Sequence, residues 1–258
     1  MKYFLLASGS SGNCSALLND ENEILLIDCG ISINLIKQRL QQVGLSFEQI
    51  KKVLITHTHT DHIKSLKAFK DEDIYIHEAT QMNDYHLFNY YEQLHLLGFD
   101  ILVLPSSHDS IGTSGFLISY QNEKMAYITD CGYIHENVLR LINNCEYYCI
   151  ESNHDPRLLM LTKRPLYLKN RILSANGHLS NQDCAYALGQ VISTKTKEIV
   201  FLHRSKEANS EDILIQTFKD IMSQMKQDIS NIRFAIAKQD QVITQSDLVY
   251  LSKLEVHQ

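Results

Sequence analysis

Metal-ligating side chains are concentrated in the segment Thr56-His57-Thr58-His59-Thr60-Asp61-His62, which directly follows the apolar run Val53-Leu54-Ile55. A strand that ends in such a cluster presents nitrogen and oxygen ligands at the edge of a sheet. Imidazole suits zinc, iron and nickel, and a carboxylate extends the choice toward manganese. The alternative is a polar loop with chance histidines, but this spacing after a hydrophobic strand favours a metal site.

Further candidate ligands stand where later strands are expected to end. These are His108 after the run Ile101–Leu104, Asp130 after Met125–Thr129 and His203 after Glu198–Leu202. Other histidines lie within strand or helix patterns and are interpreted as ordinary surface or core residues, namely His77, His86, His95 and His135.

Short apolar runs bounded by turn residues predict strands that alternate with helices. The strands are expected at residues 3–6, 16–18, 24–27, 53–56, 74–76, 101–104, 115–119, 125–129, 147–150 and 198–202. The helices are expected at residues 33–43, 63–70, 134–142, 180–193 and 213–225. Another helix is expected after Asp155-Pro156, a cap followed by proline at the first helical position.

One internal echo suggests two similar halves. Leu25-Leu26-Ile27-Asp28-Cys29-Gly30 recurs as Ala126-Tyr127-Ile128-Thr129-Asp130-Cys131-Gly132, so that each run is a strand ending in Asp-Cys-Gly. The alternative is a coincidence between two buried strands that are followed by turns.

Length and composition predict a single domain, residues 1–258, without a linker or low-complexity segment. The six cysteines form no Cys-x-x-Cys pair, and reduced cysteines in a cytoplasmic protein are expected. The apolar start is too short for a signal peptide, and no run is long enough to cross a membrane. A net charge of −6 argues against bulk attraction to nucleic acid, although bound divalent ions would offset part of it.

The histidine cluster resembles the metal-binding motif of the metallo-β-lactamase fold superfamily. The segments Ala7–Cys14, Glu151–Asp155 and Gly177–Asn181 resemble those of its YycJ/WalJ-type branch of metal-dependent DNA exonucleases. The resemblance implies an α/β fold, a four-layer αββα sandwich in which the two halves face each other.

The resemblance also implies a dinuclear site that holds two divalent ions of zinc, manganese or iron. His57, His59 and His108 would hold one ion, Asp61, His62 and His203 the other, and Asp130 would bridge them. We expect Asp61 to take part in catalysis as well as in metal binding. Three further residues are expected to support the ligands from behind, namely Asp28, Glu151 and Asn153; for Asp28 the alternative is a simple turn-forming role. Arg204 stands where the family leads us to expect leucine.

Three polar segments are candidate substrate contacts. His178, Ser180 and Asn181 at an expected helix start suit a phosphate, and His178 is expected to act as general acid or cation; the alternative is a plain helix cap with a bystander histidine. Ser11 and Asn13 lie in a polar loop that would otherwise be a flexible turn. Lys169 and Arg171 belong to a run of four cations without an acid, which would otherwise be a solvated helix face.

These features predict a cytoplasmic phosphodiesterase whose partner is DNA, most specifically a 5′-to-3′ exonuclease acting in DNA repair or maintenance; the direction follows from the resemblance alone. One alternative is a small-molecule hydrolase of thioesters or lactones, which would favour an apolar acyl pocket. Another is a non-enzymatic regulator that retains the fold, which loss of ligands would favour.

Overall fold

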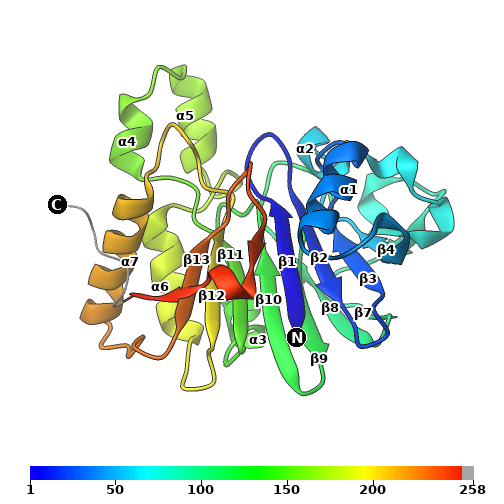
Figure 1. The fold of residues 1–258 in the computed structure, drawn as a ribbon. Coiled ribbons are helices and arrows are strands. Elements are labelled where there is room, and N and C mark those ends of the chain that lie inside the picture. Colours follow the sequence, from blue (N-terminus) through cyan, green and yellow to red (C-terminus); the bar gives the residue numbers. More distant parts are fainter. Residues whose placement is uncertain (252–258) are drawn as a thin grey trace. The chain divides into compact units, whose positions relative to one another are not determined.

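The computed structural model describes residues 1–251 and divides into two compact units. The first unit comprises residues 1–105, 110–124 and 237–247, and the second comprises residues 106–109, 125–236 and 248–251 of the described chain. Each unit holds a mixed sheet and helices (Figure 1). No helix within residues 1–251 is long and apolar enough to cross a bilayer.

The first unit contains a seven-stranded sheet in the order β14-β1-β2-β3-β4-β5-β6. Its strands are β1 (Lys2–Ala7), β2 (Cys14–Leu18), β3 (Ile24–Ile27), β4 (Ile50–Leu54), β5 (Ile74–His77), β6 (His86–Phe88) and β14 (Ile243–Thr244). The run β3 to β6 is parallel, so that these strands carry their carboxyl ends to one edge. The unit also contains the antiparallel strands β7 (Gln93–Leu96), β8 (Phe99–Pro105) and β9 (Ser114–Tyr120).

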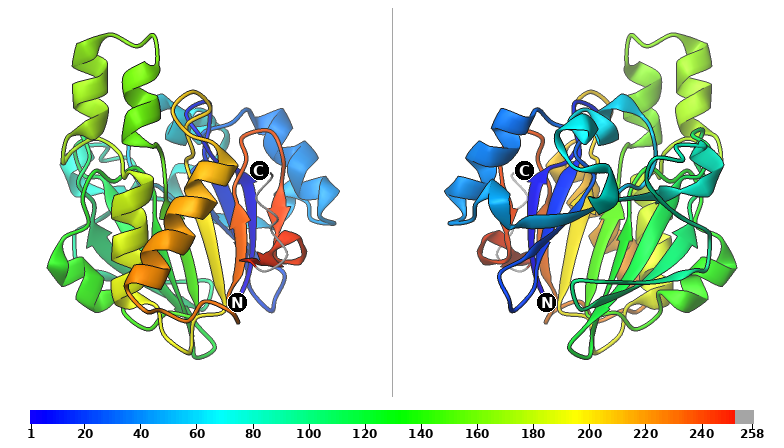
Figure 2. Two further views of the ribbon diagram at one scale, coloured as in Figure 1. Left: turned by 90° about the vertical axis from the view of Figure 1, so that its left-hand side faces the viewer. Right: turned by 90° about the vertical axis from the view of Figure 1, so that its right-hand side faces the viewer.

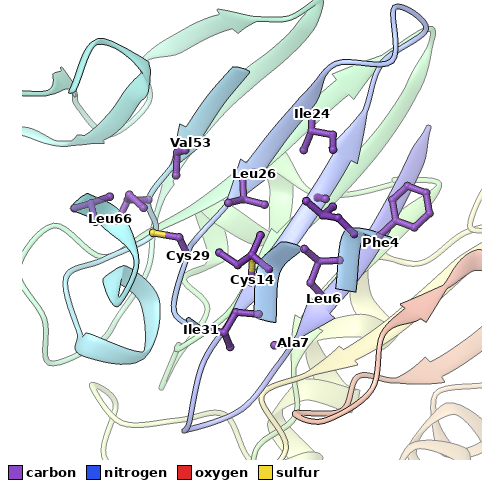
Figure 3. Close-up of a cluster of buried hydrophobic side chains, with 14 of the residues drawn as sticks. Phe4, Leu6, Ala7, Cys14, Ile24, Leu26, Cys29, Ile31, Val53 and Leu66 are labelled. Atoms are coloured by element: carbon purple, nitrogen blue, oxygen red, sulfur yellow. The ribbon is translucent and has the colours of Figure 1, made fainter. Parts of the chain in front are cut away.

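An apolar cluster forms the core between this sheet and helix α1 (Ile33–Gln42). Figure 3 shows Phe4, Leu6, Leu26 and Val53 from the strands in this cluster. Helix α1 begins where the Ser32 side chain accepts a hydrogen bond from the Leu35 amide. Its buried face has the helical spacing that predicted it, and the helix ends just before Gly44, whose φ of +75° suits glycine.

The second unit contains β10 (Glu123–Ile128) from Met125 onward, and the strands β11 (Tyr147–Glu151), β12 (Glu198–Leu202) and β13 (Arg233–Ile236) run parallel to it. Strand β15 (Val249–Tyr250) is antiparallel to β13. Its helices are α3 (Glu136–Leu141), α4 (Pro156–Leu161), α5 (Leu166–Leu173), α6 (Asn181–Val191) and α7 (Glu211–Gln224). Helices α6 and α7 pack side by side along these strands (Figure 2, left). The register pairs Ile128 with Ile150 and Glu151 with Leu202, which brings the residues after β10 and β12 to one edge.

The predicted helix at residues 63–70 is wrong. The structure has the short helix α2 (Thr60–Ile63) and a separate 3-10 turn at Leu66–Ala68. The Cys29 amide donates to the His62 carbonyl, and the Ser65 amide donates to the Cys29 carbonyl. These tertiary bonds replace the i to i−4 bonds that a longer helix would need.

The Asp-Cys-Gly echo has the same local geometry in each unit. Asp28 and Asp130 both adopt left-handed backbone, with φ of 59° and 48°. The following cysteines are buried, and the following glycines admit another chain segment. A Cβ on Gly30 would lie 1.5 Å from the Asp61 carbonyl oxygen, and one on Gly132 would lie 2.4 Å from the Ala175 carbonyl oxygen. Each Asp-Cys-Gly turn therefore packs against the backbone of a loop that carries or leads to predicted functional residues.

We predict that Gly30→Ala destabilises the protein by about 3 kcal/mol or more, because the clash is with backbone that a side-chain rotation cannot relieve. Gly44→Ala is the matched control: its Cβ would meet nothing within 4 Å, and only its positive φ costs stability. That cost is about 1 kcal/mol. Urea unfolding followed by circular dichroism gives both free energies. Equal losses in the two variants would contradict the close approach at Gly30.

Candidate metal ligands in the two units

The predicted histidine cluster lies in the first unit, in the loop and short helix that follow β4. The rings of His57 and His62 lie side by side with centroids 4.0 Å apart, and those of His57 and His59 are 4.7 Å apart. His57 and His62 are buried, whereas His59 and Asp61 are more accessible. This one loop therefore gathers three imidazoles and a carboxylate, the donor types that transition metals favour.

Asp28 holds this loop from behind. Its carboxylate accepts hydrogen bonds from the Thr56 amide at 2.8 Å and from the Thr56 hydroxyl, and its Oδ2 lies 2.8 Å from His62 Nδ1. The left-handed backbone of Asp28, which is costly for a residue other than glycine, turns the carboxylate toward the loop. The fully buried Asp28 therefore fixes the orientation of the His62 ring.

The second unit gathers another set of ligands at the carboxyl ends of its parallel strands. Asp130, Glu151, His178 and His203 each offer one donor atom, and these atoms all lie within 4.8 Å of one another. His203 Nδ1 lies 3.3 Å from Asp130 Oδ1, and His108 Nε2 lies 4.0 Å from the same oxygen. His203 also has left-handed backbone, with φ of 50°, directly after β12.

Glu151 is the centre of this set. Its Oε1 lies 2.8 Å from Nδ1 of both His178 and His203, and its Oε2 accepts the amides of Cys131 and Leu179. Burial alone would raise the pKa of Glu151, but the positive charge of His178 and the two imidazole hydrogen bonds lower it to about 2. Both oxygens are thus occupied by protein donors, which makes Glu151 a residue that orients its neighbours.

His178 is held as a cation and His108 as a neutral imidazole. Burial alone would lower the pKa of His178, but the charge and hydrogen bond of Glu151, aided by Asp130, raise it to about 9. Burial lowers the pKa of His108, and the nearby carboxylate of Asp130 only partly opposes this. Its Nδ1 lies 2.9 Å from the Gly177 carbonyl oxygen, which ties His108 to the segment that carries His178.

The donor set fits divalent transition metals. A carboxylate or carbonyl oxygen only accepts, so Nδ1 carries the proton in His62, His108 and His203, which face Asp28, Gly177 and Glu151. The lone pair is then on Nε2 of each ring. A second hydrogen bond that fixes the tautomer in this way is the usual support of a metal-binding histidine.

Several residues predicted to contact substrate are engaged within the protein. Ser180 is the N-cap of α6 and accepts from the Asp183 amide, while the buried Asn181 bonds Ser152 and Asn209. The Asn181 amide itself donates to the His154 carbonyl. These groups fasten the start of α6 to the segment after β11, and His178 is the one partly accessible member of the segment, with 18% of its side chain exposed. Phosphate contact at this helix start stays a prediction.

The remaining predicted contacts have mixed environments. Lys169 is buried and its Nζ donates to the Met160 carbonyl at 2.6 Å, whereas the half-exposed Arg171 pairs with Asp109. Ser11 is exposed, and the buried Asn13 has its Nδ2 2.9 Å from His62 Nε2. The burial of Lys169 and Asn13 favours support of the fold and of the ligand loop. Substrate contact by Ser11 and Arg171 stays a prediction.

Sequence reasoning missed two residues that support the ligands, Thr56 and Asn209. Thr56 links Asp28 to the rings of His57 and His62, at 3.1 Å from Nδ1 of each. Asn209 donates to the carbonyls of Ser152 and Asn153, and Asn153 in turn donates to the His203 carbonyl. Thr56 opens the histidine segment and so carried a signal. Asn209 follows no strand and carried none.

Residues 24–203 match the sequence profile of the Beta-lactamase superfamily domain. The chain belongs to this superfamily. It is 31% identical over 239 residues to exodeoxyribonuclease WalJ of Streptococcus pneumoniae serotype 2, which covers 86% of this chain and 88% of that protein. It is 29% identical over 238 residues to exodeoxyribonuclease YycJ of Bacillus anthracis, with 87% and 90% covered.

Solved structures confirm the fold. The metallo-β-lactamase fold protein YhfI from Bacillus subtilis matches with a TM-score of 0.69 and 17% identity, covering 95% of this chain and all of that one. Zinc-bound PqqB from Methylobacterium extorquens matches with a TM-score of 0.67 and 14% identity, covering 94% and 99%. The α/β sandwich predicted for this superfamily member is therefore confirmed.

We predict that Asp28→Asn weakens metal binding about tenfold or more, because the neutral amide supports the His62 ring less strongly than the carboxylate. Competition with a chromophoric chelator measures the affinity. Asp73→Asn is the matched control, since Asp73 pairs with Lys52 on the surface of the same unit. An unchanged affinity in Asp28→Asn would show that Asp28 shapes only the turn.

We predict that His154 makes the protein less stable in mild acid. Neither ring nitrogen of this buried histidine has a hydrogen-bond partner among residues 1–251, and burial lowers its pKa to about 4. The unfolded chain takes up a proton near pH 6.5 and the folded one near pH 4, so stability is lost as pH falls between these values.

Between pH 7 and pH 5 this loss amounts to about 2 kcal/mol, and His154→Leu should abolish it. Urea unfolding of both proteins at the two pH values measures the difference. The exposed His95 provides the control variant, His95→Leu. A pH dependence that is the same with and without His154 would contradict its burial in the neutral form.

Proposed function

We propose that the chain is a metal-dependent phosphodiesterase, most specifically a 5′-to-3′ DNA exonuclease. The observation that carries this proposal is the similarity, over 86–87% of this chain, to two proteins named exodeoxyribonucleases, at 29–31% identity. The cationic His178 beside Asp130 supports it, because a fixed positive charge suits an anionic phosphodiester better than a neutral acyl substrate. The 5′ direction and a role in DNA repair or maintenance belong to the same proposal.

We propose further that the two units are halves of one catalytic domain, residues 1–258, whose ligand sets together hold two divalent ions. Zinc, manganese and iron are the candidates that the donors suit. One ion would be held by His57, His59 and His108, the other by Asp61, His62 and His203, with Asp130 as bridge. When bound, such ions supply Lewis acidity and lower the pKa of water.

The chain's own residues have separate tasks in this proposal. Asp61 is a ligand that also helps to orient the attacking water. His178, with its Nδ1 proton bonded to Glu151, offers its other ring nitrogen to the departing sugar oxygen. Glu151 maintains the charge of His178 and at the same time orients His203. One buried carboxylate thus links the proton donor to a metal ligand.

We also propose that the protein acts in the cytoplasm. No disulfide joins its six cysteines, all of which lie buried within residues 1–251. Buried thiols without disulfides are typical of a reducing compartment. No observation favours the alternative chemistry, which is hydrolysis of thioesters or lactones. None favours a purely regulatory role.

Two substitutions separate the roles of Asp130 and His178. His178→Ala should retain both metals and lower turnover on DNA about a hundredfold or more, the scale of losing a proton donor or charge. It should affect a diester with an activated leaving group much less. Asp130→Ala should lose metal and activity on both substrates.

Metal analysis by mass spectrometry and single-turnover assays on labelled DNA measure these effects, with the surface substitution His95→Ala as control. Loss of a metal ion from His178→Ala would make His178 a ligand and contradict the division of roles. Normal DNA turnover in Asp130→Ala would remove Asp130 as a bridge.

A further inference from the structure

Helices α4 and α5 form an antiparallel pair, residues 156–173, which we call the helical arm. In Figures 1 and 2 the arm stands clear of the other helices of the second unit. Both of its ends join the candidate site. Asp155 caps α4 four residues after Glu151, and α5 leads to His178, whose amide donates to the Ile172 carbonyl at 3.0 Å.

The base of the arm is firmly attached. Leu159 and Ile172 pack with Ala208 in a buried cluster, and the Asp155 amide donates to the Ala208 carbonyl at 2.9 Å. The bond from Lys169 Nζ to the Met160 carbonyl joins the two helices. A rigid base means that the far end of the arm is held at a fixed position relative to His178.

The far end of the arm carries large apolar side chains in water. Leu161 is 81% exposed, Tyr167 75%, Leu166 63% and Met160 48%. Three of the four most exposed large apolar side chains within residues 1–251 are therefore on this tip. A concentration of this kind marks an interaction surface, because single scattered residues would suffice for a solvated helix pair.

The charge of the arm indicates an anionic ligand. The arm contains five cations and no acid, in a chain whose net charge is −6; the cations are Arg157, Lys163, Arg164, Lys169 and Arg171. Three of these cations pair with acids of neighbouring segments, namely Arg157 with Asp155, Arg164 with Glu207 and Arg171 with Asp109, and Lys169 is bound inside the arm. Lys163 is exposed and forms no ion pair with the described part of the chain, and the Arg157 side chain is 84% exposed despite its pair. A second copy of the chain would bring like charges together, which disfavours it as the occupant.

We infer that the tip of the helical arm binds the unpaired bases of a DNA strand, with Tyr167 stacked on a base and Lys163 and Arg157 near phosphates. This inference rests on the proposed function. A single strand offers both chemistries of the tip, since its bases have apolar faces and its backbone is anionic. Helix α5 spans eight residues, or about 12 Å, and separates Tyr167 near its start from the segment that leads to His178.

The test compares Tyr167→Ala with Tyr186→Ala, a control on α6 in which the same residue type is removed from a surface position that is 46% exposed. Binding is measured by fluorescence anisotropy with a labelled phosphorothioate single strand that resists cleavage, and turnover with an unmodified strand and with a dinucleotide too short to reach the tip. Tyr167→Ala should weaken binding of the long strand about tenfold. Its turnover of the dinucleotide and the behaviour of the control should be unchanged.

The outcomes separate the inference from the proposed function. If the wild type cleaves DNA but Tyr167→Ala binds the long strand as tightly as the wild type, the inference about the tip is wrong and the proposed function stands. If Tyr167→Ala binds the long strand more weakly but the wild type cleaves no DNA, the proposed exonuclease activity is wrong and the docking surface remains. If Tyr167→Ala instead loses self-association in sedimentation, or binding to anionic lipid vesicles, with unchanged DNA affinity, the tip serves another partner and the inference is wrong.

Discussion

The second unit depends on one buried carboxylate, that of Glu151. A fully buried charge is costly unless it is paired and hydrogen-bonded, and Glu151 meets this condition with two imidazoles and two backbone amides. These four donors come from three separate segments, which follow β10, α5 and β12. Satisfying the carboxylate therefore forces His178, His203 and the turn at Cys131 into one arrangement, and the chemistry of the site follows from it.

Asp28 has the corresponding position in the first unit. It also follows a parallel strand, is fully buried and supports a histidine through Nδ1. In both units a carboxylate oxygen, which can only accept a hydrogen bond, lies beside the histidine Nδ1 and fixes the tautomer. The lone pair that could bind a metal is then on Nε2. The glycine after each Asp-Cys pair then admits the loop that leads to the functional residues. Positive φ values at Asp28, Asp130 and His203 are the conformational cost of this arrangement.

The sequence was sufficient to predict what depends on local pattern. The positions of Asp130 and His203 at one sheet edge were predicted because each follows an apolar strand, and parallel strands carry their ends to one edge. The helix at residues 63–70 was predicted wrongly because Ser65 bonds Cys29 across the fold, which no local periodicity reveals. The burial of individual side chains could not be predicted from the sequence either. A lysine in a run of cations is expected at the surface, but the ammonium group of Lys169 is bound inside the helical arm.

The central proposal is that this chain, when it holds two divalent ions, hydrolyses DNA from a 5′ end. It is tested most directly by titrating metal-free protein with manganese or zinc while following nucleotide release from strands labelled at either end. We expect nucleotide release to begin at the 5′ end and its rate to rise until two equivalents of metal are bound. Release only from the 3′ end, full activity with one equivalent, or hydrolysis of a thioester without any release from DNA would contradict it.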